Sequence, residues 1–212
     1  GPEVLVRVTA AGLCHSDLHV QKGFMDLGQE GKLTFAERGA VLPMTFGHEV
    51  AGIVQAVGPE VNSVKPGQQV LVFPWIGCGE CDACNEDRES DCATMRIIGL
   101  KQKGGFATHC LVEHDKFLVD IDGLDAADVV PHACSGITVF NALEKMGALR
   151  SDEWIAIMGC GGLGMNAISI ARAMSFNNII AVDIDNGKLE AALEMGATKV
   201  LNSKNEIGRA HV

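Results

Sequence analysis

The sequence predicts an α/β plus β protein, in which a β-rich first half precedes the opening half of a doubly wound parallel sheet. Two observations indicate this fold class. Short apolar segments separated by turn residues fill the first half, and strands alternate with helices from Ser151 onward. The composition, with 47% hydrophobic and 21% charged residues among 212, is that of a globular chain that can bury a core.

Three segments of the first half carry a strand pattern. Residues 3–11, EVLVRVTAA, alternate apolar and polar side chains, and residues 50–57 and 69–73 are rich in β-formers. Gly and Pro cluster at 58–59 and 65–68, where we expect turns. Short strands divided in this way predict a small antiparallel barrel or sandwich.

The second half changes to an alternation of strands and helices. We expect strands at 154–158, 178–183 and 198–201, and helices at 163–175 and 188–195, the second ended by Gly196. Successive strands joined by helices form a parallel sheet with right-handed crossovers. The chain stops soon after the third strand, so we expect a fragment whose turnover on its own is weak or absent.

The charge balance excludes two classes of partner. There are 17 Lys and Arg against 27 Asp and Glu, a net charge of −10, and no basic run. Nucleic acid and anionic membranes need clustered positive charge, so neither is expected to bind. The uncharged stretch 154–171 contains four glycines and is better explained by a strand, a turn and a helix than by a membrane span. With no export signal, the cytoplasm is the expected location.

Four of the eight cysteines form one tight cluster. Intervals of two, two and seven residues separate Cys78, Cys81, Cys84 and Cys92. Four thiolates in one loop can fill the tetrahedral shell of a structural zinc ion. The alternatives are an iron–sulfur cluster, which usually brings its fourth cysteine sooner or follows it with proline, and a set of unrelated buried thiols.

A glycine-rich turn follows the first strand of the second half. It contains Gly159, Gly161, Gly162 and Gly164, and a pyrophosphate can approach such a backbone at the start of the following helix. Asp183 ends the next strand about twenty residues on, where an acid binds the ribose of a dinucleotide. Its carboxylate would repel a 2′-phosphate, so NAD is expected rather than NADP. Asp183 could otherwise be an ordinary residue at a strand end.

Three further motifs, each weak evidence alone, accompany the cysteine cluster and the glycine turn. They are GLCHSDLH around Cys14, GHEVAG around His48 and ACSGITVFNAL around Cys134. Together with CGECDAC and GCGGLG, in this order and approximate spacing, they resemble the zinc-dependent medium-chain alcohol dehydrogenases over nearly the whole chain. The resemblance implies a GroES-like catalytic domain with a structural zinc loop at 1–135 and a partial NAD-binding Rossmann domain at 136–212.

The resemblance also implies roles for individual residues. Cys14, His48 and Cys134 would bind a catalytic zinc ion and leave one position open, and Asp17 would orient His48. Ser16 and His19 would relay a proton, and Glu49 would help to exchange metal ligands. His15 and Lys188 would contact the cofactor. For His15 and His19, a solvated histidine in a loop is the alternative.

The implied activity is hydride transfer between an alcohol and NAD, giving an aldehyde or ketone, with two zinc ions per chain in a parent enzyme that is a homo-oligomer. A polyol dehydrogenase of the same superfamily is the closest alternative, although many polyol enzymes carry glutamate where this chain has Cys134. Two more hypotheses are an inactive zinc-binding fragment and a zinc-ribbon module for nucleic acid. The lack of basic surface disfavours the zinc-ribbon module.

Overall fold

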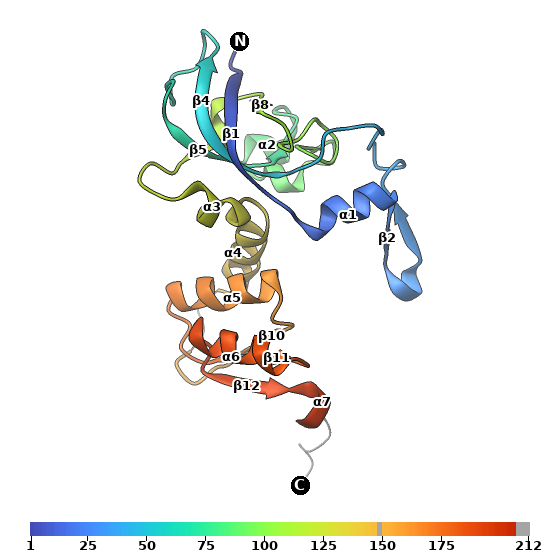
Figure 1. Ribbon diagram of the computed structural model, residues 1–212, viewed down its shortest axis with the longest axis vertical. Helices are drawn as coiled ribbons and strands as arrows, with labels where there is room; N and C mark the ends of the chain where they lie inside the picture. Colours follow the sequence, from blue (N-terminus) through green and yellow to red (C-terminus); the bar gives the residue numbers. More distant parts are fainter. Residues whose placement is uncertain (148–149, 207–212) are drawn as a thin grey trace. The chain divides into compact units, whose positions relative to one another are not determined.

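The computed structural model describes residues 1–147 and 150–206, with the side chains of 205 and 206 left out. The chain divides into two compact units, Gly1–Cys134 and Ser135–Val212. Figure 1 shows the β-rich part in blue to green and the alternating part in orange to red. The predicted Rossmann domain, 136–212, includes residues 148–149 and 207–212, which lie outside the described residues.

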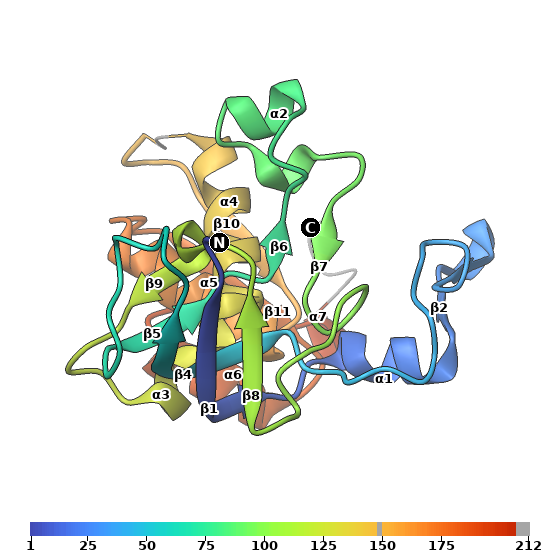
Figure 2. The ribbon, with the colours of Figure 1, turned by 90° about the horizontal axis from the view of Figure 1, so that it is seen from above.

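A five-stranded antiparallel sheet forms the centre of the first unit. Its order is β8 (His109–Val112), β1 (Val4–Gly12), β4 (Glu49–Val57), β5 (Gln69–Val72) and β9 (Leu118–Asp120). Figure 2 shows β5, β4, β1 and β8 lying side by side. The three strands predicted in this half are β1, β4 and β5, and they are confirmed to within one or two residues at each end.

Alternation along these strands builds the core. Val4 and Val6 of β1 are buried, whereas Arg7 is exposed. The core also takes residues from β4, β5, β8 and the short segments near them: Val50, Val54, Val70, Val72, Ile76, Ile98, Cys110, Val112 and Phe117. The β-branched side chains suit a pleated sheet with one buried face.

Short elements surround the sheet. Between β1 and β4 lie α1 (His15–Lys22), β2 (Phe24–Asp26), η1 (Gly28–Glu30) and β3 (Lys32–Thr34). After β5 come β6 (Trp75–Ile76), α2 (Asp82–Asn85), η2 (Glu89–Asp91) and β7 (Arg96–Ile97). The unit closes with η3 (Asp115–Phe117), α3 (Ala126–Val129) and η4 (Val130–Ala133). Of these, β2 pairs with β3 and β6 with β7, both antiparallel.

The second unit opens with α4 (Ser135–Met146) and contains a parallel sheet in the order β10 (Ile155–Met158), β11 (Ile179–Asp183) and β12 (Lys199–Asn202). The connecting helices are α5 (Gly162–Ala173) and α6 (Asn186–Glu194), and α7 (Ser203–Glu206) follows β12. The alternation predicted from Ser151 onward is thus confirmed. Apolar residues of α4, α5, β11 and α6 share one core, with Ile168, Ala171 and Ile179 fully buried.

The uncharged stretch 154–171 is divided between β10, a glycine turn and α5. Within the part of the chain that the structure describes, no helix has the length and apolar character needed to span a bilayer.

Candidate metal centres and cofactor loop

Four side chains from three separate segments meet in the first unit. Donor atoms of Cys14, His48, Glu49 and Cys134 all lie within 4.8 Å of one another. Cys14 precedes α1, His48 and Glu49 stand at the start of β4, and Cys134 follows η4. The two thiol sulfurs are 3.9 Å apart although 120 positions separate them in the chain. The structure therefore brings the three predicted zinc ligands together with Glu49.

Asp17 connects two of these segments. Its Oδ2 accepts a hydrogen bond from the backbone N–H of Cys14 at 3.0 Å, and its Oδ1 accepts one from Gly47 at 3.1 Å. The first bond caps α1, which begins at the next residue. Only 2% of Asp17 is exposed. A buried carboxylate held by two backbone donors fixes the positions of Cys14 and His48 relative to each other.

His48 lies against the same carboxylate. Its Nδ1 is 3.3 Å from Oδ1 of Asp17, close enough for an ion pair, but it has no hydrogen-bond partner of acceptable geometry in the described structure. The contact is therefore mainly electrostatic. Metal-bound histidines direct their other ring nitrogen toward such carboxylates, so the orientation of this ring fits a cation bound at its opposite nitrogen.

A glycine strap, residues 104–106, holds the turn before His48. Gly104, Gly105 and Phe106 donate backbone hydrogen bonds of 2.8, 2.8 and 2.9 Å to the carbonyls of residues 45, 47 and 46. Gly47 has φ +94, and an added Cβ would lie 2.7 Å from the Phe106 ring. Sequence reasoning missed this strap, although the Gly104-Gly105 pair was the available signal.

The four side chains perturb one another strongly. Hydrogen bonds from Cys134 and His48 lower the pKa of Cys14 to about 3, and the hydrogen bond with Cys14, burial and the Cys14 charge raise the pKa of Cys134. Burial would lower the pKa of His48, but Asp17 and Cys14 outweigh it and raise that pKa to about 9. Burial and the Cys14 charge raise the pKa of Glu49 to about 7. The cluster thus favours a charged Cys14 thiolate next to a protonated His48 ring.

These residues fit a zinc ion. Two sulfurs, one imidazole nitrogen and one carboxylate oxygen are donors that Zn²⁺ accepts, and four such atoms suit a tetrahedral shell. Cys14, which is a thiolate without a metal, would also bind the metal as a thiolate. His48 would release its proton and bind as the neutral ring.

The predicted relay residues lie on α1 beside this cluster. Ser16 Oγ is 3.7 Å from Cys14 Sγ and is half-buried. The His15 and His19 rings stack obliquely with centroids 4.7 Å apart, His15 exposed and His19 half-buried. Within the described residues, neither histidine side chain hydrogen-bonds to Ser16 or to any other group. The structure thus brings Ser16 to the cluster and keeps the two histidines next to each other.

The second donor group is the four-cysteine loop. The sulfurs of Cys78, Cys81, Cys84 and Cys92 lie within 4.8 Å of one another, with Cys81 and Cys84 3.5 Å apart. None is in a disulfide, and Cys84 and Cys92 are buried. Backbone N–H groups of Glu80 and Cys81 lower the pKa of Cys78 to about 6. Four convergent thiols, joined by no His, Asp or Glu among the described residues, fit a closed structural zinc site.

The glycine turn of the second unit has the form that a dinucleotide requires. Gly159 has φ +90, and a Cβ on Gly164 would lie 1.8 Å from the Gly159 carbonyl oxygen, so helix α5 packs directly on the turn. A Cβ on Gly161 or Gly162 would meet nothing within 4 Å. These two glycines face a hollow of about 340 Å³ beside the N-terminus of α5.

Asp183 stands at the end of β11, next to this turn. Its Oδ2 accepts a hydrogen bond of 2.7 Å from the Cys160 N–H, and its Oδ1 accepts bonds from the N–H groups of Ile184 and Asp185. These donors, with the Cys160 N–H first, lower the pKa of Asp183, and the charge of Lys188 contributes. The bond from Cys160 was not foreseen from the sequence. Lys188 itself is exposed in the first turns of α6.

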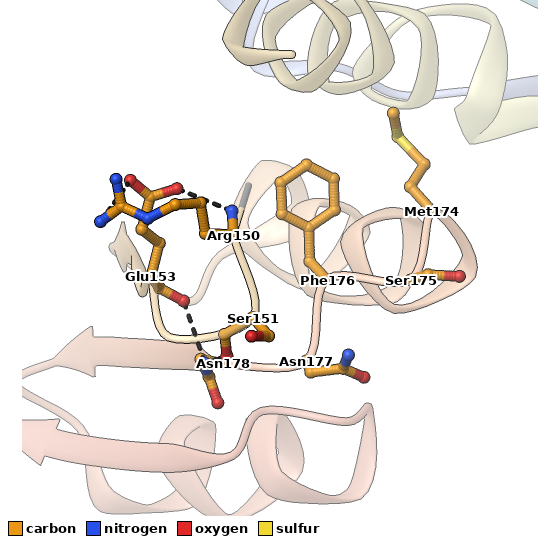
Figure 3. Close-up of a pocket in the computed structure, with 8 residues that line it drawn as sticks. All are labelled: Arg150, Ser151, Glu153, Met174, Ser175, Phe176, Asn177 and Asn178. Atoms are coloured by element: carbon orange, nitrogen blue, oxygen red, sulfur yellow. Dashed lines mark hydrogen bonds and ion pairs between the residues drawn. The ribbon is translucent and has the colours of Figure 1, made fainter. Parts of the chain in front are cut away.

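Another pocket lies at the opposite ends of these strands. Its volume is about 240 Å³. Figure 3 shows the residues that line it, which come from 150–153 before β10 and 174–178 before β11. Asn178 donates to the carbonyls of Ser151 and Glu153, and Arg150 pairs with Glu153. None of the predicted site residues lines this pocket.

Comparison with known proteins defines the class. Residues 1–123 match the alcohol dehydrogenase GroES-like domain, and residues 162–211 match the family described as zinc-binding dehydrogenase. The chain therefore belongs to the zinc-dependent medium-chain alcohol dehydrogenase family, which confirms the resemblance found in its motifs.

Individual relatives agree. The NAD-dependent alcohol dehydrogenase of Sulfurisphaera tokodaii is 39% identical to this chain, over 97% of this chain and 58% of its own length. An alcohol dehydrogenase of Geobacillus stearothermophilus is 37% identical, over 96% of this chain and 57% of its own length. The chain thus spans less than two thirds of these relatives.

Among solved structures, the alcohol dehydrogenase of Aeropyrum pernix has a TM-score of 0.85 at 29% identity, covering 97% of this chain and 59% of the other. The D-arabinose dehydrogenase of Sulfolobus solfataricus has a TM-score of 0.84 at 32% identity, covering 97% and 61%. These likenesses confirm the predicted fold class, a GroES-like part followed by Rossmann-type strands.

Proposed function

We propose that this chain carries the zinc sites and the NAD-binding turn of an alcohol dehydrogenase, which transfers a hydride between an alcohol and NAD to give an aldehyde or ketone. The observation that carries the proposal is the meeting of Cys14, His48 and Cys134 beside Glu49, because nothing but folding brings these distant residues together. The family membership and the NAD-dependent relatives support it.

The chain's own residues have distinct tasks in this reaction. Cys14, His48 and Cys134 would hold a zinc ion, which when bound makes an alcohol easier to deprotonate and polarises a carbonyl. Asp17 keeps the His48 ring oriented. Ser16, at the edge of the cluster, would accept the alcohol proton and pass it toward His19. Glu49 would exchange with the other ligands of the metal.

The second unit would hold the cofactor. Gly159, Gly161, Gly162 and Gly164 would bind the pyrophosphate and Asp183 the ribose hydroxyls, with His15 and Lys188 as further cofactor contacts. A charged Asp183 disfavours a 2′-phosphate, which supports NAD. We expect the cytoplasm as the location, because the cysteines are free thiols and those of the two metal clusters must stay reduced to bind zinc.

A sugar or polyol substrate is the second candidate. It is favoured by the likeness to the D-arabinose dehydrogenase of Sulfolobus solfataricus. Cys134 in the ligand cluster supports the alcohol dehydrogenase type instead.

Metal analysis of the purified chain tests the proposal. We expect about two zinc ions per chain. Cys14→Ser should remove one and Cys81→Ser the other, and the double variant should contain neither. If both single variants lost the same ion, or if iron replaced zinc, the assignment of ligands would be wrong. Because turnover by these residues alone is expected to be weak, binding of a primary alcohol to the zinc-loaded chain, compared with binding of a pentose, then separates the two substrate classes.

A further inference from the structure

The last residue pair of β1 and β4 lies at the Cys14 cluster. Gly12, which ends β1, is paired directly with Glu49, which begins β4. Cys14 follows shortly after Gly12, and His48 immediately precedes Glu49. One pair of strands therefore brings two predicted zinc ligands and the Glu49 carboxylate to the same place.

Gly12 leaves free the space that the Glu49 side chain occupies. A Cβ on Gly12 would overlap Oε2 of Glu49 and would lie 3.0 Å from its Cβ and 3.1 Å from its Cδ. Opposite residues of an antiparallel pair normally have Cβ atoms about 4.5–5.5 Å apart, so the two strands come close together here. The pairing is irregular between Val8 and Ala10, just before this point, and a bulge increases the local twist of a strand.

The need for glycine at this position comes from space and not from backbone conformation. Gly12 does not have a positive φ, so its backbone is one that any residue can adopt. Glu49 is only 5% exposed, and its donor oxygen lies within 4.8 Å of the other three donors of the cluster. Oε2 is the end of a flexible side chain, whereas ladder hydrogen bonds hold the strands. A methyl group at residue 12 would therefore displace the carboxylate from the cluster.

Resting on the function proposed above, we propose that Gly12 is a positioning residue of the metal site, which lets the Glu49 carboxylate reach the cluster as a donor because it carries no side chain itself. Gly12 has no atom that binds a metal and acts only through Glu49. The other donors of the cluster are two sulfurs and one ring nitrogen, so displacement of the carboxylate leaves three protein donors for a zinc ion.

A double-mutant cycle on zinc affinity at the Cys14 site, measured by competition with a chromophoric chelator, tests this. Gly12→Ala and Glu49→Gly should each lower the affinity about tenfold. Glu49→Gly removes all three atoms that the added methyl group would meet. The double variant should therefore match Glu49→Gly to within about twofold. An affinity that falls by the product of the two single losses would show that Gly12 acts independently of Glu49, and would overturn the inference.

Gly52→Ala is the matched control, because Gly52 belongs to the same pair of strands. A Cβ there would overlap the Arg7 carbonyl oxygen and lie 2.8 Å from the Val6 side chain, neither of which belongs to the cluster. Gly52→Ala should lower the melting temperature and leave the zinc affinity of the Cys14 site unchanged. Equal losses of affinity in Gly52→Ala and Gly12→Ala would mean that general strain between the strands weakens the site, contrary to the inference.

Retention of zinc by the four-cysteine loop reports whether each variant folds. If Gly12→Ala loses this ion as well, the double variant decides. Removal of the Glu49 side chain should restore the ion if the methyl group and the carboxylate compete for one space, and failure to restore it would count against the inference.

A cobalt spectrum gives a readout that a change in stability alone would not move. With Co²⁺ in the Cys14 site and zinc in the four-cysteine loop, the visible spectrum depends on the ligands of the cobalt ion. We expect Gly12→Ala and Glu49→Gly to share one spectrum, and the wild type and Gly52→Ala to share another. Identical spectra for the wild type and Glu49→Gly would show that the carboxylate is not a donor, which refutes the inference.

The two proposals can fail separately. If the wild type holds zinc only in the four-cysteine loop, the proposed function and this inference both fail. If it holds both ions and Gly12→Ala binds them with unchanged affinity, only this inference fails. If the variants behave as expected but the zinc-loaded chain binds neither NADH nor an alcohol, the role of Gly12 stands and the proposed function fails.

Discussion

Asp17 is the residue on which the geometry of the first metal site depends most. One carboxylate accepts a hydrogen bond from the Cys14 N–H, accepts another from the Gly47 N–H and faces the His48 ring. Burial alone would raise the pKa of Asp17, but His48 and the backbone donors outweigh it and lower that pKa. A neutral amide would keep the shape of this side chain and lose one acceptor and the charge.

We therefore expect Asp17→Asn to lower zinc affinity at the Cys14 site about 10- to 100-fold, the usual cost of losing the partner of a ligand histidine. Competition with a chromophoric chelator measures this. Asp128→Asn, an exposed carboxylate of α3, is the matched control and should leave affinity unchanged. The four-cysteine site should hold its zinc in both variants; loss of both ions from Asp17→Asn would show a folding defect instead.

Asp115 is another carboxylate that joins two segments of the first unit. Its Oδ2 accepts hydrogen bonds from the Ser63 hydroxyl at 2.7 Å, the Ser63 N–H at 3.1 Å and the Asn62 N–H at 3.3 Å. It thereby ties the loop after β4 to η3. The Ser63 hydroxyl is the main reason that the pKa of Asp115 is lowered.

This lowered pKa predicts a pH dependence of stability. Because the folded-state pKa lies below the unfolded value of about 3.9, Asp115 stabilises the fold fully above that value and loses its contribution as the pH falls through the folded pKa. Asp115→Asn should cost about 2 kcal/mol at neutral pH and flatten the loss of stability below about pH 4. Urea melts across pH measure this, with Glu60→Gln, an exposed carboxylate nearby, as control. An unchanged acid limb in Asp115→Asn would refute it.

At the scale of elements, the turn between β10 and α5 depends on Gly164 more than on its neighbours. A Cβ there would lie 1.8 Å from the Gly159 carbonyl oxygen, and backbone cannot move away cheaply, whereas the same atom on Gly161 would enter open space. The two glycines belong to the same motif for different physical reasons. Gly164 allows α5 to pack against the turn, and Gly161 leaves room for a ligand.

We expect Gly164→Ala to lower the melting temperature by several degrees, because about 2–3 kcal/mol of overpacking strain must be relieved by moving α5. Gly161→Ala should melt like the wild type and bind NADH at least tenfold more weakly. Thermal denaturation and NADH fluorescence measure the two effects. Equal melting temperatures for both variants would mean that α5 adjusts freely.

Several elements could be predicted because their signals are local. β1, β4 and α5 each repeat an apolar period over enough residues, and β10 is an apolar run that ends at a glycine turn. β8 and β9 are only four and three residues long, and the hairpin partners β2 and β3 have three each, too short for a period to be read. Helix α4 was not predicted as a helix, although its residues overlap the motif around Cys134.

The candidate sites also differ in whether a local signal in the sequence predicts them. The four cysteines of the structural loop are close in sequence, so their spacing predicts their meeting. Cys14, His48 and Cys134 could be joined only through a family resemblance, since no local signal reports a contact across 120 positions. The glycine strap at 104–106 and the bond from the Cys160 N–H to Asp183 depend on backbone positions, which composition and motifs do not reveal.

At the scale of the whole molecule, both candidate metal sites belong to the first unit. The four-cysteine loop is also tied to the segment after β8 by two ion pairs, Arg96 with Glu113 and Lys116 with Glu89. Cys134 ends the unit, one residue before α4. Metal bound here would stabilise the native state of this unit, because a ligand set drawn from distant segments does not exist in the unfolded chain.

Removal of zinc should therefore loosen the two units unequally. With a strong chelator, we expect backbone amides of β1, β4 and the cysteine loop to exchange hydrogen at least about tenfold faster. Amides of β10, β11 and β12 should keep their rates, because neither candidate metal group among the described residues includes a residue of the second unit. Hydrogen exchange with mass spectrometry measures both sets in one sample. Zinc added back should restore the slow rates in the wild type, whereas Cys81→Ser should recover them only around Cys14. Equal acceleration in both units would show that they unfold as one cooperative body and that metal binding stabilises the entire chain.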